Sequence, residues 1–206
     1  IYGTQWKSFP KPLNPNGYLV ADMSSDILSR PFDWINFGVV YAGAQKNMGP
    51  AGATVVFVRE DILGKSGRTL PTMLDYATHI KDASMFNTPP VFSVYVINET
   101  LKWLKGLGGV KKIEEINERK ANKLYKAIDE SSLFKNPVAK EDRSPMNVTF
   151  VMKQEGRDEE FLEFCKARGL QQLKGHRSVG GFRASIYNAM PEEGVDELIK
   201  AIKEFA

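Results

Sequence analysis

Three short apolar runs, separated by turns rich in glycine and proline, most constrain the fold of this chain. They are Tyr18–Asp22, Gly38–Ala42 and Thr54–Val58. Runs of this length that are rich in β-branched and aromatic residues and bounded by turn residues predict buried strands. From Pro89 onward the apolar spacing becomes helical, until Gly106 interrupts it. The first half of the chain is therefore expected to be part of an α/β sheet domain.

The second half alternates helical and strand-like patterns. The expected elements are a helix at 110–130, a strand at 147–152, a helix at 158–168, strands at 170–173 and 182–187, and a helix at 193–205. This order predicts a small α+β layer. On the long helix we expect a solvent-facing side without a site, marked by Lys111, Lys112, Glu114, Glu115, Glu118 and Lys120. We predict two domains, residues 1–109 as the later part of a large sheet domain and residues 110–206 as a small one.

Composition disfavours several functions. The net charge is only +3, and basic residues alternate with acidic ones, which argues against nucleic-acid binding. One cysteine, Cys165, and two distant histidines, His79 and His176, cannot build a metal site. Neither histidine stands in a nucleophile-elbow context, so a hydrolase has little support. We expect a structural role for His79 and a packed position for Cys165.

The apolar stretches, the single cysteine and the first residue of the chain bear on the compartment in which the protein is expected. No uninterrupted apolar stretch approaches the length of a membrane span, so no membrane partner is expected. A single cysteine allows no disulfide within the chain, which suits a reducing compartment, and we expect the cytoplasm. The chain starts at Ile1 rather than at a methionine, so the sequence leaves open a preceding organelle transit peptide.

Lys46 and Asp22 are the first candidate catalytic residues. Lys46 follows the strand that ends at Gly43, and the nearest lysines are Lys11 and Lys65. Asp22 closes another expected strand. An amine and a carboxylate at two strand ends match the needs of pyridoxal phosphate, whose aldehyde forms a Schiff base with lysine and whose ring nitrogen pairs with a carboxylate. The alternatives are a solvated surface lysine and an aspartate that caps a helix or turn.

Two further segments are candidate anion sites. Asn87 and Thr88 open the helix that contains Trp103, where free backbone N–H groups and the helix dipole favour a phosphate. Ordinary capping is the alternative there. Gln45, beside the lysine, is another candidate phosphate ligand. The segment 175–183 holds three glycines, which allow close approach of the backbone, and two arginines, which bind carboxylate or phosphate.

Four motifs together resemble the phosphoserine aminotransferase family, which belongs to the fold-type I pyridoxal-phosphate enzymes. They are residues 21–25, residues 41–52, residues 87–90 and residues 174–187. The resemblance runs in order from about residue 18 to the C-terminus. It implies an α/β fold made of a partial large cofactor-binding sheet domain and a C-terminal α+β domain.

The resemblance also implies roles for cofactor-binding residues. Lys46 corresponds to the Schiff-base lysine and Asp22 to the carboxylate at the pyridine nitrogen. Gln45 would bind the cofactor phosphate of its own subunit, whereas Asn87 and Thr88 would bind that of the partner subunit. The resemblance thus implies a homodimer with shared sites.

Further roles concern the substrates. His176, Arg177 and Arg183 would bind their anionic ends, with Arg183 on the α-carboxylate, and Ser24 would lie near the cofactor. The implied reaction transfers the amino group of glutamate to 3-phosphohydroxypyruvate, giving phosphoserine and 2-oxoglutarate in L-serine biosynthesis.

The family is longer than this chain, which corresponds to about its later three-fifths. The missing N-terminal portion supplies further site residues in the family. Two alternatives remain at this point: another class V aminotransferase, of the serine or alanine–glyoxylate type, and a non-catalytic fragment that only dimerises or binds anions. The three basic residues His176, Arg177 and Arg183 argue against the first, because a small neutral side chain needs no such cluster.

Overall fold

The structure is a computed structural model that describes residues 2–205. It contains two compact units, one of residues 9–107 and another that combines residues 2–8 with residues 108–205. No helix within residues 2–205 has both the length and the apolar character needed to cross a membrane.

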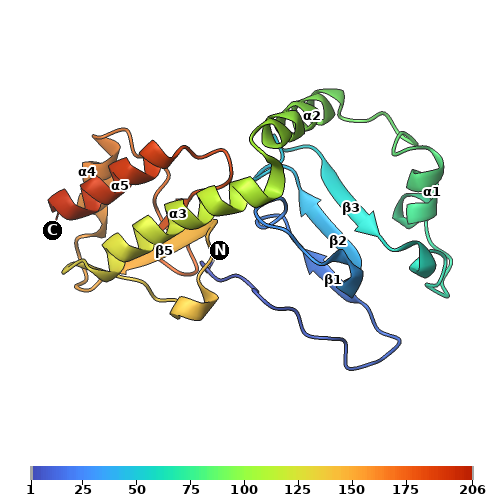
Figure 1. The fold of residues 1–206 in the computed structure, drawn as a ribbon, viewed down its shortest axis with the longest axis horizontal. Coiled ribbons are helices and arrows are strands. Elements are labelled where there is room, and N and C mark those ends of the chain that lie inside the picture. Colours follow the sequence, from blue (N-terminus) through green and yellow to red (C-terminus); the bar gives the residue numbers. More distant parts are fainter. Residues whose placement is uncertain (1, 206) are drawn as a thin grey trace. The chain divides into compact units, whose positions relative to one another are not determined.

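The first unit contains a three-stranded sheet in the order β1–β2–β3 (Figure 1). Its strands are β1 (Leu19–Asp22), β2 (Phe37–Gly43) and β3 (Thr54–Val58). Strands β1 and β2 are parallel, and β3 runs antiparallel to β2. The structure therefore confirms the three predicted strands. The core beside them consists of Met23, Ile27, Phe37, Val40, Ala42, Ala44 and Met48.

Short helices and one long helix complete this unit. They are η1 (Trp34–Asn36), η2 (Glu60–Ile62), η3 (Thr72–Leu74), α1 (Tyr76–Lys81) and α2 (Val91–Gly106). Helix α1 was not expected from the sequence, although Asp75 marks its start by accepting a hydrogen bond from the Ala77 N–H at 3.0 Å. His79 has a local partner, because its Nε2 lies 3.1 Å from the Met73 carbonyl oxygen.

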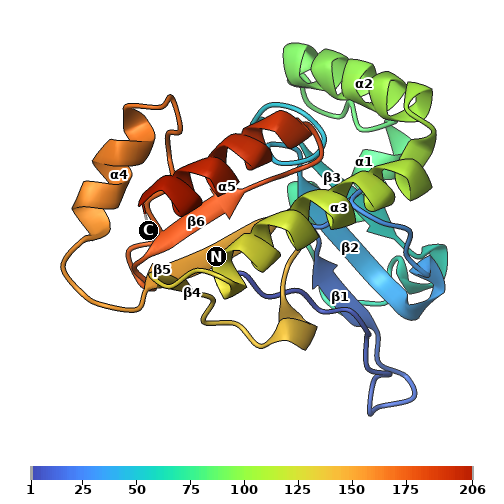
Figure 2. The same cartoon turned by 60° about the vertical axis from the view of Figure 1, so that its left-hand side comes forward.

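The second unit packs helices on an antiparallel sheet in the order β4–β5–β6. Its elements are α3 (Gly109–Asp129), β4 (Phe134–Lys135), η4 (Lys140–Asp142), β5 (Asn147–Met152), α4 (Asp158–Lys166), β6 (Phe182–Ser185) and α5 (Glu192–Phe205). Helices α3 and α5 lie side by side along the sheet (Figure 2). The expected helix–sheet layer is therefore present, with β4 as an added edge strand.

Aromatic side chains fill the core of this unit. The rings of Phe134 and Phe161 have centroids 4.7 Å apart, and those of Phe161 and Phe182 are 5.0 Å apart. Cys165 is fully buried among them, and burial raises the pKa of its thiol to about 11. This confirms a packed thiol, which stays protonated and unreactive near neutral pH.

Two expectations for this unit are wrong. Residues 170–173 form no strand, because Gln172 has φ +61°, in the left-handed region that a strand excludes. Pairing with β6 starts only at Lys174, which bridges to Phe182. Lys120, expected on the solvent-facing side of α3, is 0% exposed. Its amine is accommodated because backbone carbonyls accept its hydrogen bonds.

Candidate active site

The carboxyl ends of β1 and β2 lie next to each other because the two strands are parallel. Asp22 pairs with Tyr41 in the register, and Ser24 then joins the two strand ends. The Ser24 backbone N–H donates to Asp22 Oδ1 at 2.8 Å, and Ser24 Oγ accepts from the Gly43 N–H at 3.0 Å. The Asp22 carboxylate is exposed and forms no ion pair within residues 2–205. The carboxyl group is therefore held by the Ser24 N–H and is open to a ligand.

Lys46 lies on the turn that follows β2. The Met48 and Gly49 N–H groups both donate to the Ala44 carbonyl oxygen, at 3.0 and 2.9 Å. Buried Asn47 anchors the turn by donating to the Ile27 carbonyl oxygen at 2.9 Å. In the described part of the chain, Lys46 Nζ has neither a hydrogen bond nor an ion pair, and its side chain is exposed. A rigid turn thus presents a free primary amine, near the strand end that presents Asp22.

Gln45 and the glycines around it shape the same turn. A Cβ on Gly43 would lie 2.5 Å from Gln45 Oε1, so the Gln45 side chain folds over Gly43 and would have to move if that position carried a side chain. Gly52 has φ +118°, and a Cβ there would lie 2.8 Å from Ser93 Oγ. Ser93, on α2, donates to the Ala51 carbonyl oxygen at 3.0 Å. Helix α2 therefore supports the far end of this loop.

Asn87 and Thr88 precede α2 without capping it. The N-cap position is Pro90, and no side chain caps this helix. Asn87 Nδ2 instead donates to the Thr88 carbonyl oxygen at 3.2 Å, and both side chains are exposed. Ordinary capping does not explain these two residues. Their polar groups remain available to an anion, which the expected phosphate-binding role needs.

The glycine-rich segment of the second unit is a tight loop. The backbone carbonyl oxygen of His176 accepts hydrogen bonds from the Val179 and Gly180 N–H groups, at 2.8 and 2.9 Å. The Ser178 N–H donates to His176 Nδ1 at 3.3 Å, which makes Nδ1 an acceptor. In the neutral ring the proton is then on Nε2, which can donate to an anion. Arg177 is exposed and has no ion-pair partner within residues 2–205.

Arg183 comes from β6, where alternate residues face opposite sides of the sheet. Phe182 and Ala184 are buried in the core, whereas Arg183 is only partly buried. Its backbone N–H donates to the Leu173 carbonyl oxygen at 2.8 Å. Its Nε is buried and has no hydrogen-bond partner in the described residues. A buried guanidinium N–H without a partner is costly, so this arginine is suited to an incoming carboxylate.

The predicted site residues thus form two groups in different units. The strand ends of the first unit bring together Asp22, Ser24, Gln45 and Lys46, with Asn87 and Thr88 ahead of α2, and the second unit holds His176, Arg177 and Arg183. Sequence reasoning missed the supporting roles of Asn47 and Ser93. An isolated amide next to the lysine was the only available signal for Asn47. No group of residues that could hold a metal occurs among residues 2–205.

The class-V aminotransferase family matches residues 13–198. The chain belongs to the class-V aminotransferase family. It is 55% identical over 204 residues to a phosphoserine aminotransferase of Flavobacterium psychrophilum, which covers 99% of this chain and 56% of that protein. The resemblance inferred from the motifs is therefore confirmed.

Solved structures of phosphoserine aminotransferases are similar to this chain. Phosphoserine aminotransferase from Bacillus circulans subsp. alkalophilus has a TM-score of 0.95 at 49% identity, with 100% of this chain and 56% of that one covered. The pyridoxal-phosphate-bound enzyme from Trichomonas vaginalis has a TM-score of 0.91 at 42% identity, with 98% and 57% covered. These matches confirm the fold-type I α/β class. The chain spans about half the length of the relatives it matches.

Proposed function

We propose that the protein containing this chain is a phosphoserine aminotransferase that uses pyridoxal phosphate. It would transfer the amino group of glutamate to 3-phosphohydroxypyruvate. The observation that carries this proposal is the free amine of Lys46, held on a fixed turn near the strand end that presents the unpaired carboxylate of Asp22. The similarity to phosphoserine aminotransferases over the whole chain supports it.

The residues present fit the cofactor. Bound pyridoxal phosphate supplies an aldehyde that takes up the amino group and a ring that accepts electrons. Lys46 would hold the cofactor covalently through Nζ. Asp22, kept in place by the Ser24 N–H, would hold a proton on the ring nitrogen. Gln45 would contact the phosphate.

Lys46 has a second role when the substrate amine takes its place. Its free Nζ would then be placed to take the proton from the substrate Cα as a general base and to give it back as a general acid. The turn of residues 44–49 keeps this amine near the strand ends throughout the cycle, because both sides of the turn are hydrogen-bonded.

The second unit would recognise the substrates. Arg183 would pair with the α-carboxylate, which satisfies its buried Nε. His176 and Arg177 would meet the phosphate or the distal carboxylate. Two anion-binding groups favour dianionic substrates over the serine or alanine of the alternative aminotransferases.

The proposal includes a homodimer in which Asn87 and Thr88 bind the phosphate of the partner's cofactor. Their exposed position ahead of an uncapped helix supports this. We also propose a cytoplasmic location, and we assign residues 1–109 to the cofactor domain and residues 110–206 to the small domain.

The test uses the full-length protein loaded with pyridoxal phosphate. Lys46→Ala should abolish transamination and the near-visible absorbance of the lysine-bound cofactor. Lys65→Ala, which changes another exposed lysine of the same unit, should leave both unchanged. A Lys46→Ala protein that retains most activity would refute the assignment. If the wild type neither absorbs nor turns over, the chain is part of a non-catalytic protein.

A further inference from the structure

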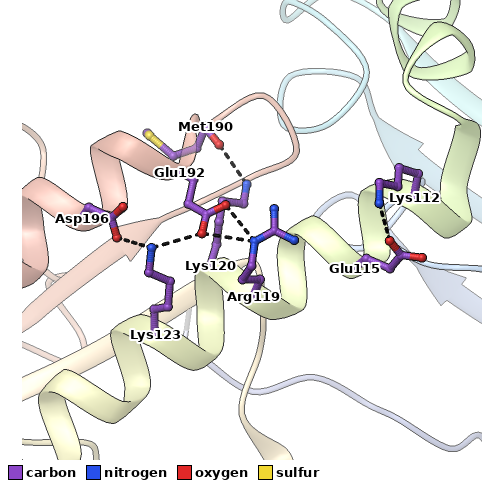
Figure 3. A network of polar contacts seen from close by, with 8 residues as sticks. All are labelled: Lys112, Glu115, Arg119, Lys120, Lys123, Met190, Glu192 and Asp196. Atoms are coloured by element: carbon purple, nitrogen blue, oxygen red, sulfur yellow. Dashed lines mark hydrogen bonds and ion pairs between the residues drawn. The ribbon is translucent and has the colours of Figure 1, made fainter.

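Lys120, on α3, is a fully buried lysine that the proposed chemistry does not use. Its Nζ donates to three backbone carbonyl oxygens, those of Ile186 at 3.2 Å, Tyr187 at 2.9 Å and Met190 at 3.0 Å. Figure 3 shows the contact with Met190. An ammonium group has three N–H donors, so this arrangement uses all of them. Lys120 Nζ therefore binds one short backbone segment, residues 186–190, rather than a carboxylate.

That segment is where the chain leaves β6. The Ile186 N–H still donates to the Met146 carbonyl oxygen at 2.9 Å, and the Met190 N–H then closes a turn by donating to the Tyr187 carbonyl oxygen at 2.9 Å. The Tyr187 carbonyl oxygen thus has a donor within the turn, whereas the Ile186 and Met190 carbonyl oxygens need donors from elsewhere. Lys120 supplies these donors from the neighbouring helix.

Asn117 reinforces the same contact from the preceding turn of α3. It is 1% exposed, and its Nδ2 donates to Asn188 Oδ1 at 2.8 Å. Asn188, also buried, lies between the residues that Lys120 binds. Together Asn117 and Lys120 form what we call the α3 clamp on residues 186–190.

The segment held by this clamp continues directly from the strand that carries Arg183. Strand β6 is only four residues long and pairs with β5 along its whole length, so the segments at its two ends add to the few contacts that fix its position. At its start is the glycine-rich loop, whose residues 175–181 are half-buried or exposed. The α3 clamp is at its other end. The Nε of Arg183 is buried and has no hydrogen-bond partner among residues 2–205, so the position of β6 decides which groups this arginine can meet.

We propose that Lys120 is a positioning residue. By tying the carbonyls of Ile186, Tyr187 and Met190 to α3, it holds β6 where Arg183 binds the substrate carboxylate. This inference rests on the proposed function, because that function gives Arg183 its ligand.

The charge of Lys120 adds a testable pH dependence. Burial lowers its pKa to about 8, and the nearby Glu192 opposes this shift. Glu192 itself pairs with Arg119 and Lys123, and Asp196 with Lys123 (Figure 3). Two strands also pack on α3: β5 carries no charged side chain, and β4 carries the exposed Lys135. A neutral amine has only two N–H donors, so deprotonation removes one of the three hydrogen bonds that Lys120 donates to this segment.

The experiment compares variants of the cofactor-loaded full-length protein. Lys120→Met should raise KM for glutamate about tenfold and change kcat less than about twofold, because carboxylate binding contributes to ground state and transition state alike. Lys123→Met is the control, since Lys123 pairs with carboxylates at the surface and not with the turn. Asn117→Ala should also raise KM for glutamate, but by less than Lys120→Met does. It replaces Lys120→Met in the test if that variant does not fold.

Amide hydrogen exchange tests the clamp without any variant. Protection of the Ile186 and Met190 amides should fall between pH 7 and pH 9, relative to amides in α5. Unchanged protection, or variants that lose thermal stability while KM stays constant, would overturn the positioning role. A wild type without transaminase activity would instead refute the proposed function, and the exchange result would still test the clamp.

Discussion

Gly175→Ala should disturb the substrate-binding loop for a purely steric reason. A Cβ at position 175 would lie 2.0 Å from the Gly180 carbonyl oxygen and 2.8 Å from that of Gly181. Real Cβ contacts essentially never fall under 3.0 Å, so the first contact must open by about an ångström. The backbone of Gly175 is not in the left-handed region, which means that conformational strain does not contribute.

The cost can be estimated from the contacts. Overpacking of this kind costs about 1–3 kcal/mol, and loss of the 2.7 Å hydrogen bond from the Gly175 N–H to the Gly181 carbonyl oxygen adds about 1 kcal/mol. We therefore expect a loss of roughly 2–4 kcal/mol in the free energy of unfolding. Because the loop carries His176 and Arg177, a displacement of this size should also raise KM for phosphoserine, by up to about 100-fold.

The assay combines urea denaturation with steady-state kinetics of the full-length protein. Gly180→Ala is the matched control in the same loop: its φ is +74°, but a Cβ there meets nothing within 4 Å. It should cost only about 1–2 kcal/mol of backbone strain and leave KM nearly unchanged. A Gly175→Ala protein that matches the wild type in both stability and KM would refute the steric argument.

Three further outcomes are expected. Asp22→Asn should retain the cofactor but slow turnover by several powers of ten, because the ring nitrogen loses its charged partner; a near wild-type rate in a single-turnover assay would reduce Asp22 to a turn residue. Arg183→Lys keeps the charge but loses the bidentate fork, so KM should rise for both glutamate and phosphoserine, and an unchanged KM would contradict carboxylate binding. Hydrogen bonds from Arg143 lower the pKa of Asp129, so their pair stabilises the fold above the unfolded pKa of about 4 and the contribution is lost as the pH falls through the lower folded value. Asp129→Asn should therefore destabilise the protein by about 1–2 kcal/mol at pH 7, and its difference from the wild type in thermal denaturation should shrink in strong acid.

Much of the site could be predicted because its signals are local. The apolar run of β2 ending at Gly43, followed by a lone lysine among small residues, indicates an amine at a strand end without any tertiary information. The alternation of Phe182, Arg183 and Ala184 likewise indicates which of them faces the core. Such patterns depend on the two-residue period of a strand, which the sequence alone displays.

Only the tertiary structure decided which polar groups are buried and which distant residues pair with them. The pattern of α3 placed Lys120 among the solvent-facing charges, yet carbonyl groups 66 to 70 residues further along the chain make its burial tolerable. Residues 170–173 read as a strand, but left-handed Gln172 delays pairing until Lys174. The unpaired Nε of Arg183 is equally a tertiary fact. The sequence by itself therefore determined most of the strands and helices and the candidate chemistry. The burial and pairing of single polar groups depended instead on which distant backbone atoms the fold brought beside them.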